Sequence, residues 1–152
     1  MIVDTAASIR EISTDLRPPL LDYAGLAAAL ESYAQQFTRR TGIVVQFVCE
    51  NHGARLAPEL ESLLFRICQE ALTNCAKHSR ATSAMVTLIK IGRPIILTIT
   101  DNGVGFEPLQ LGREGRIGLG LLNMREMTEV AGGALAIEST PGKGTRIAIE
   151  IA

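Results

Sequence analysis

Two pairs of glycines flank one polar loop, and an aspartate precedes the first pair. In chain order these residues are Asp101, Gly103, Gly105, Gly118 and Gly120. Glycine adopts positive φ and lacks the Cβ that would keep a ligand away from the backbone. The Asp101 carboxylate accepts hydrogen bonds without donating any, so it suits the amino group of a base. A helix beginning at Gly118 and Gly120 would offer free N–H groups to phosphate. The pattern favours a purine nucleotide site.

A second polar group lies beside the most regular apolar stripe of the sequence, between residues 60 and 75. At 100° per residue, Glu70, Asn74 and Lys77 fall within about 60° of one another on one flank of this stripe, and His78 lies at its end. The Asn74 amide oxygen suits Mg²⁺, which takes few protein ligands besides phosphate. Lys77 would offset phosphate charge, and Glu70 could position or deprotonate a nucleophile. From the helix alone, an ordinary solvated edge is the preferred interpretation, because polar residues are common at core boundaries.

The remaining elements follow from apolar periodicity and from turn residues. Helices are expected over residues 26–41, 58–79 and 119–131, and strands over residues 43–49, 85–91, 95–100, 135–139 and 145–151. A thin stripe in residues 1–16 predicts a short helix that Pro18 and Pro19 stop. Strands joined by tight turns predict an α/β (α+β) two-layer sandwich, with a mixed, mainly antiparallel sheet covered on one face by helices.

Length and composition indicate one soluble globular domain. The chain has 152 residues, 47% of them hydrophobic and 20% charged, with a net charge of −1. This balance gives no reason to expect nucleic-acid binding or membrane contact by the chain itself, and no signal peptide is expected. Three cysteines in no metal-binding spacing are expected to be reduced core residues, which favours a cytoplasmic protein.

Two glycine motifs in the sequence are poor matches to the phosphate-binding loops of other nucleotide-binding folds. The Gly118-x-Gly120 pair lacks the third glycine of the dinucleotide fingerprint, because Asn123 occupies that position. Residues 142–145 imitate a P-loop, but Gly144 separates Lys143 from Thr145. A hairpin turn is the preferred interpretation of residues 142–145.

The order and spacing of the polar segments carry more information than any one of them. Residues 70–78, 101–106 and 118–121 resemble the N box and the two glycine boxes of the family that unites gyrase, the Hsp90 chaperone, histidine kinases and MutL. The resemblance covers roughly residues 43–152. Within this family the chain looks most like bacterial sensor histidine kinases of the nitrate/nitrite-sensor type. That closer likeness rests on residues 15–18, 25–26, 123–126 and 141–145 and on the short loop between the glycine boxes.

The resemblance implies the Bergerat-type sandwich of the family, with ATP between the long helix and the loop. Asp101 matches the residue that binds the adenine amino group, and Thr145 matches one that supports the base through water. Gly103 and Gly105 match the first glycine box; Gly118, Leu119, Gly120 and Leu121 match the second, beside the phosphates. Asn74 matches the Mg²⁺ ligand, Glu70 the acidic residue that assists phosphoryl transfer, and Lys77 and His78 match positions near the phosphates. With the family in view, a functional role for Glu70 and Asn74 is preferred.

The resemblance also implies partners and a division of the chain. Residues 1–21 would be the remnant of a second dimerisation helix with its linker, and residues 22–152 the ATP-binding catalytic domain. The sequence contains His52 and His78, and neither matches the acceptor histidine of the family, so the chain is not expected to phosphorylate itself. The expected partners are the phosphoacceptor dimerisation domain of the same kinase and a downstream response regulator, within a homodimeric full-length protein.

Two other functions remain open from the sequence. One is a serine kinase of the anti-sigma-factor type, or another ATPase of the same superfamily. The other is a non-enzymatic module that senses nucleotides, although the presence of Glu70, Asn74 and Asp101 argues against it.

Overall fold

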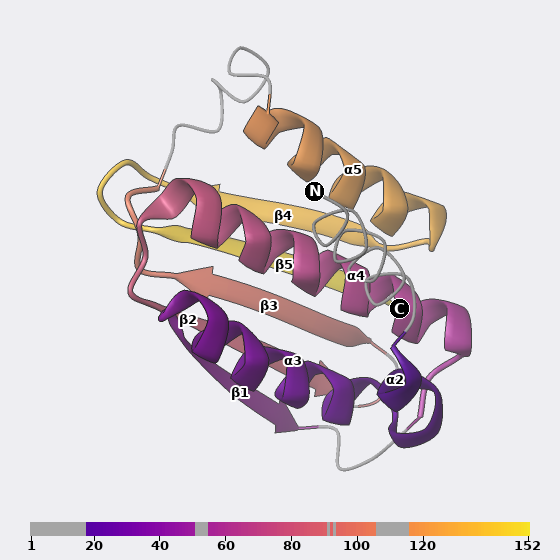
Figure 1. Ribbon diagram of the computed structural model, residues 1–152. Helices are drawn as coiled ribbons and strands as arrows, with labels where there is room; N and C mark the ends of the chain where they lie inside the picture. Colours follow the sequence, from indigo (N-terminus) through magenta and orange to yellow (C-terminus); the bar gives the residue numbers. More distant parts are fainter. Residues whose placement is uncertain (1–17, 51–54, 91, 93, 106–115) are drawn as a thin grey trace, which may run out of the picture.

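The computed structural model describes residues 18–50, 55–90, 92, 94–105 and 116–152 (Figure 1). The predicted helix over residues 1–16, the predicted turn over residues 51–53 and most of the loop between the glycine boxes lie outside these residues. No helix in the described part of the chain is both long enough and apolar enough to span a bilayer.

Five strands form one sheet in the order β1-β2-β3-β5-β4. They are β1 (Val44–Glu50), β2 (Ser83–Lys90), β3 (Ile95–Asp101), β4 (Ala134–Ser139) and β5 (Thr145–Ile151). Strands β1 and β2 are parallel, whereas the pairs β2–β3, β3–β5 and β4–β5 are antiparallel. A parallel pair needs a long crossover connection, and helix α4 lies in the segment between β1 and β2. The predicted mixed, mainly antiparallel sheet is confirmed.

The helices cover one face of this sheet (Figure 1). They are α2 (Pro19–Ala24), α3 (Leu26–Thr41), α4 (Pro58–Asn74) with the π-helix η1 (Cys75–Ser79), and α5 (Arg116–Val130). The predicted two-layer arrangement is confirmed. The largest differences from the prediction concern two helices: the short helix α2, which begins at Pro19, was not predicted, and α5 begins at Arg116 rather than Leu119. Proline fits the first turn of a helix because the N–H it lacks has no intrahelical acceptor there.

The core lies between the helices and the inner face of the sheet. Strand β5 alternates along its length, with Ile147, Ile149 and Ile151 buried. Leu72 of α4 and Met124 of α5 are fully buried on the helical side. The three cysteines are free thiols, and burial raises the pKa of the Cys68 thiol to about 12. Cys68 is therefore a protonated core side chain, as predicted.

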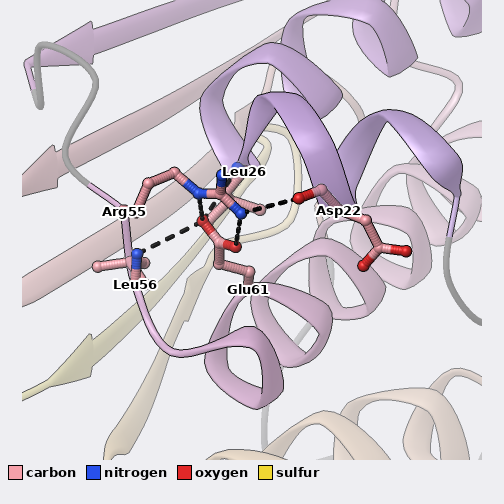
Figure 2. A network of polar contacts seen from close by, with 5 residues as sticks. All are labelled: Asp22, Leu26, Arg55, Leu56 and Glu61. Carbon is pink, nitrogen blue, oxygen red and sulfur yellow. Dashed lines mark hydrogen bonds and ion pairs between the residues drawn. The ribbon is translucent and has the colours of Figure 1, made fainter.

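A buried carboxylate fixes the beginning of α4 against the junction of α2 and α3 (Figure 2). Glu61 is 1% exposed and accepts hydrogen bonds from Arg55 Nε and Nη2, at 3.2 and 3.0 Å, and from the Leu26 backbone N–H at 3.3 Å. The first N–H groups of a helix have no intrahelical acceptor, so Glu61 caps α3 from a different helix. Gly25 has a φ of +94°, and a Cβ there would lie 3.0 Å from Arg55 Cδ. We call Arg55, Glu61 and the Leu26 N–H the Glu61 network.

Candidate nucleotide-binding site

A cavity opens where the C-terminal end of α4 and η1 meet the last residue of β3, the first residues of β5 and the first part of α5. It is lined by Ala71, Asn74, Cys75, His78, Ser79, Asp101, Gly105, Leu121, Thr145 and Ile147. Most of these side chains are apolar or small, and a few polar groups converge on the cavity, which is the usual composition of a ligand pocket.

Asp101 is the last residue of β3 and lies half-buried in this cavity. One of its oxygens, Oδ1, accepts a hydrogen bond from the Gly103 N–H at 2.8 Å. Burial raises the pKa of the Asp101 carboxyl, and this effect outweighs the opposing backbone hydrogen bonds from Gly103 and Thr145. An ionised carboxylate has about four acceptor sites. Asp101 can therefore accept further hydrogen bonds from a ligand. Such a bond would favour the charged form of the carboxylate.

The first glycine pair lets segments of the protein approach one another closely. A Cβ at Gly103 would lie 2.5 Å from Ser79 Cβ, and the adjoining Val104 N–H donates to the Ser79 carbonyl at 2.7 Å. Gly105 has a φ of +66°, and a Cβ there would collide with the Thr140 carbonyl oxygen. The sequence suggested that these glycines allow a ligand to approach the backbone. The structure shows that they also join the end of β3 to η1 and to the β4–β5 turn.

Glu70 and Asn74 lie one turn apart on α4, next to Gly120 of α5. A Cβ at Gly120 would lie 2.6 Å from Glu70 Oε1 and 3.2 Å from Asn74 Nδ2. Asn74 Nδ2 is buried and has no hydrogen-bond partner among the described residues. An unsatisfied buried donor costs roughly 1–3 kcal/mol, so it calls for a partner other than the described residues. The glycine preserves the space in which such a partner would lie.

The polar end of α4 is shaped by a π-helical turn. Ser79 Oγ donates to the Cys75 carbonyl at 2.7 Å and accepts from the Ala81 N–H at 3.1 Å, and Arg80 ends the turn at a φ of +56°. π-helical turns are rare and occur frequently at functional sites. This turn carries His78 and Ser79 to the cavity lining.

The structure brings most of the predicted residues to one place. Asn74, His78, Asp101, Gly105, Leu121 and Thr145 line the cavity, and Glu70, Gly103 and Gly120 border it. Lys77 is exposed and lies outside the set of described residues that line the cavity. Gly118 and Leu119 lie in the first turns of α5, in a stretch whose side chains are not described.

The cavity lining also includes four residues that the sequence did not predict as site residues: Ala71, Cys75, Ser79 and Ile147. Ala71 and Cys75 could have been found, because they share a helical stripe with Asn74 and His78. Cys75 is indeed buried, as predicted, but it also lines the cavity. Ile147 alternates with outward residues of β5 in the same way as the core isoleucines, so no local signal separates it from them.

The residues at the cavity fit a nucleotide bound with a divalent cation. The Asp101 carboxylate is an acceptor that is only partly used within the protein, and apolar side chains also line the cavity. Beside Gly120 lie the Glu70 carboxylate and the buried Asn74 side-chain nitrogen, which has no partner among the described residues. That nitrogen can only donate a hydrogen bond, as to a phosphate oxygen. Amide and carboxylate oxygens are suitable ligands for Mg²⁺.

Comparison with known proteins agrees with this geometry. Residues 59–152 match the family described as histidine kinase-, DNA gyrase B-, and HSP90-like ATPase, and the chain belongs to this family. It is 38% identical over 141 residues to the sensor histidine kinase MctS of Rhizobium johnstonii, covering 93% of this chain and 31% of that protein. It is 36% identical over 151 residues to the signal transduction histidine-protein kinase/phosphatase DegS of Brevibacillus brevis, covering 99% of this chain and 38% of that protein. The chain therefore spans about a third of the length of these relatives.

Solved structures share the fold. The blue-light activated histidine kinase EL346 of Erythrobacter litoralis matches with a TM-score of 0.72 at 21% identity, over 95% of this chain and 49% of that one. Full-length ShkA in complex with AMPPNP matches with a TM-score of 0.66 at 19% identity, over 84% of this chain and 29% of that one. The predicted family and the Bergerat-type fold are confirmed.

Proposed function

We propose that this chain is the ATP-binding catalytic domain of a two-component sensor histidine kinase of the nitrate/nitrite-sensor type. The observation that carries the proposal is the buried Asn74 side-chain nitrogen beside Glu70 and Gly120, which has no partner among the described residues, in a cavity that Asp101 also lines. Membership of the ATPase family and the names of its two curated relatives support the same function. A structural neighbour is named as a complex with AMPPNP, which supports ATP as the ligand.

In this proposal Asp101 binds the adenine amino group. Its carboxylate lies at the end of a buried strand and is oriented by the Gly103 N–H. A half-buried acceptor selects a donor strongly, because a ligand that lacks the donor would leave the charge desolvated and unpaired. Thr145 lies directly opposite Asp101 in the β3–β5 register, and it would support the same base through water. The apolar walls, including Leu121 and Ile147, would hold the ring.

The phosphates would lie between α4 and the first turns of α5, beside Gly118, Leu119 and Gly120. Asn74 would hold Mg²⁺ through its amide oxygen, and Lys77 and His78 would lie near the phosphates. A bound Mg²⁺ supplies neutralisation of the phosphate charge. Phosphoryl transfer depends chiefly on positioning and charge stabilisation. Glu70, one turn from Asn74 on the same helix, is suited to orient or deprotonate the acceptor nucleophile.

The acceptor is proposed to be a histidine on the dimerisation domain of the same kinase, outside this chain. Residues 1–21 are proposed as the remnant of a dimerisation helix with its linker; that boundary falls inside α2. The full-length protein would be a cytoplasmic homodimer, or the cytoplasmic part of a membrane-bound sensor, and would pass its phosphoryl group to a response regulator.

The experiment has two stages. A non-hydrolysable ATP analogue is first titrated into the chain with and without Mg²⁺, with exposed Gln35 of α3 mutated to alanine as a neutral control. ATP and Mg²⁺ are then added with a supplied dimerisation domain of a sensor histidine kinase. We expect nucleotide binding, acid-labile phosphohistidine on the supplied domain and none on the isolated chain. Stable phosphohistidine on the isolated chain, acid-stable phosphoserine on a partner, or binding without transfer would each contradict the proposal.

A further inference from the structure

The side chain of Asn102 takes the place of a main-chain carbonyl where β3 leaves the sheet. Asn102 follows Asp101, whose partner Ala84 is in the last pair of the β2–β3 register, and its N–H donates to the Ser83 carbonyl at 3.2 Å. In an antiparallel ladder, two residues paired in this way normally exchange both of their main-chain hydrogen bonds. The Ser83 N–H instead donates to Asn102 Oδ1 at 3.1 Å. The main-chain carbonyl of Asn102 is therefore released from the ladder, and the chain can turn away from β2.

The same side chain also binds the residue before β2. The Thr82 N–H donates to Asn102 Oδ1 at 3.0 Å, and Asn102 Nδ2 donates to Thr82 Oγ1 at 2.9 Å. Two N–H donors directed at one atom identify that atom as the amide oxygen. Three side-chain hydrogen bonds thus join the end of β3 to the segment that links η1 to β2.

The turn that follows Asn102 brings two walls of the cavity together. The Gly103 N–H donates to Asp101 Oδ1 at 2.8 Å, and the Val104 N–H donates to the Ser79 carbonyl at 2.7 Å. A Cβ at Gly103 would lie 2.5 Å from Ser79 Cβ, so the turn packs directly on the end of η1. Asp101 and Ser79 line the same cavity from different elements. The turn therefore fixes the separation between them.

We propose that Asn102 is a positioning residue of the nucleotide site: its side chain holds Asp101 against η1, so that the cavity is formed before a nucleotide binds. The effect on affinity rests on the proposed function, whereas the effect on the shape of the cavity does not. A site that is already formed binds more tightly, because the ligand does not have to order it. The role needs a short side chain with an oxygen acceptor, which aspartate shares with asparagine and alanine lacks.

Two buried cysteines report on the cavity without any nucleotide. Cys75 lines the cavity and is 3% exposed, whereas Cys68 lies in the core and is 1% exposed. The nucleotide-free chain is labelled with iodoacetamide, and mass spectrometry gives the rate at each cysteine. Asn102→Ala should raise the rate at Cys75 about tenfold relative to that at Cys68, because the cavity opens locally while the core stays closed. A general loss of stability would instead raise both rates together.

Two further variants make the labelling specific. Asn102→Asp keeps an oxygen that can accept from both N–H groups, so Cys75 should stay as slow as in the wild type. Thr38 is the matched control, because its Oγ1 accepts from the Val45 N–H at 3.0 Å near the start of β1. Thr38 is not among the described residues that line the cavity. Thr38→Val should therefore leave the ratio of the two rates unchanged.

Calorimetry with a non-hydrolysable ATP analogue measures the consequence for binding. Asn102→Ala should weaken binding by about three- to tenfold, and Thr38→Val should not weaken it. Equal acceleration at both cysteines, fast labelling of Cys75 in Asn102→Asp, or unchanged affinity in Asn102→Ala would each overturn the role of Asn102 and leave the proposed function intact. A wild-type chain that binds no ATP analogue would overturn the proposed function, while the labelling would still test whether Asn102 shapes the cavity.

Discussion

Helix α4 carries a polar side chain with buried atoms near each of its ends, and the two side chains differ in how their hydrogen bonds are satisfied. Near the N-terminal end, Glu61 accepts hydrogen bonds from Arg55 and from the backbone N–H groups of Leu26 and Leu56. At the C-terminal end, the Asn74 side chain has a buried nitrogen with no partner among the described residues. Asp101 also lines the cavity, and burial raises the pKa of its carboxyl.

The comparison separates what stabilises the fold from what the fold presents to a ligand. The Glu61 network is closed within the chain, so opening it should lower the free energy of unfolding and leave nucleotide affinity unchanged. The polar groups around Asn74 and Asp101 are only partly satisfied, so changing them should lower nucleotide affinity with little loss of stability. Enzyme sites commonly retain such locally unfavourable groups, and substitutions there can stabilise the free protein.

The largest effect is expected at Glu61. Glu61→Ala should lower the free energy of unfolding by about 3 kcal/mol, because removing one partner of a buried ion pair leaves the others unpaired. The value is at the low end of the usual range because the Arg55 side chain is 48% exposed and can reach water. Urea denaturation measures the change, and Glu59→Ala, at an exposed position in the same first turn, is the control. A loss equal to that of the control would show that the network contributes nothing.

The next effect is expected at Asp101. Asp101→Asn should weaken adenine-nucleotide binding by about 2 kcal/mol or more, because a charged acceptor for the base is lost. Calorimetry with an ATP analogue measures this, with thermal unfolding as the check on folding. Unchanged affinity would remove Asp101 from the site.

Because the pKa of Asp101 is raised, we expect the stability of the fold and the affinity for nucleotide to depend on pH in opposite directions. Its pKa is raised in the folded chain, so the protonated form stabilises the nucleotide-free fold. That contribution is present below the unfolded-state pKa and is lost as the pH rises through the folded-state pKa. Asp101→Asn should therefore be more stable than the wild type at neutral pH and similar to it in acid. Nucleotide affinity of the wild type should instead fall as the pH falls through the raised pKa; a flat binding profile would contradict this.

Gly120→Ala should separate the two properties in a single variant. Alanine is favoured over glycine inside a helix by about 1 kcal/mol, but its Cβ would displace the Glu70 carboxylate and press on Asn74. We expect stability to change by less than about 1 kcal/mol and affinity for the Mg²⁺-bound ATP analogue to fall about tenfold. Parallel urea denaturation and calorimetry measure both. Full affinity in a folded variant would place the phosphates elsewhere.

The smallest and most specific effect is expected at Asn74. Asn74→Ala removes the proposed metal ligand together with an unsatisfied buried donor, so the fold should lose little stability. Affinity for the ATP analogue should fall in the presence of Mg²⁺ and change much less without it. Calorimetry with and without the metal provides its own control. Equal losses in both conditions would exclude a role in metal binding.

Local patterns in the sequence were sufficient to predict most elements and their layers. The apolar stripe of α4 and the alternation of β5 each report burial on one face, and both are present within a single element. The π-helical turn was not predictable, because one widened turn hardly changes the apolar spacing between Ala71 and Ser79. Helix α2 was missed because a proline that ends one segment can equally begin the next.

Contacts between distant segments were the part that the sequence did not reveal. Glu61 looks like an ordinary charge in a first helical turn, and only the packing of Arg55 and Leu26 around it makes it a buried anchor. Asp101, Asn74 and the glycines could be predicted as site residues because their order along the chain matches that of a known family.

A crystal structure with an ATP analogue and Mg²⁺ tests the central claim most directly. We predict the adenine amino group within hydrogen-bonding distance of an Asp101 carboxylate oxygen, and the metal bound by the Asn74 side-chain oxygen next to Gly120. A base bound away from Asp101, or a cavity that stays filled by its own side chains at saturating nucleotide, would contradict it.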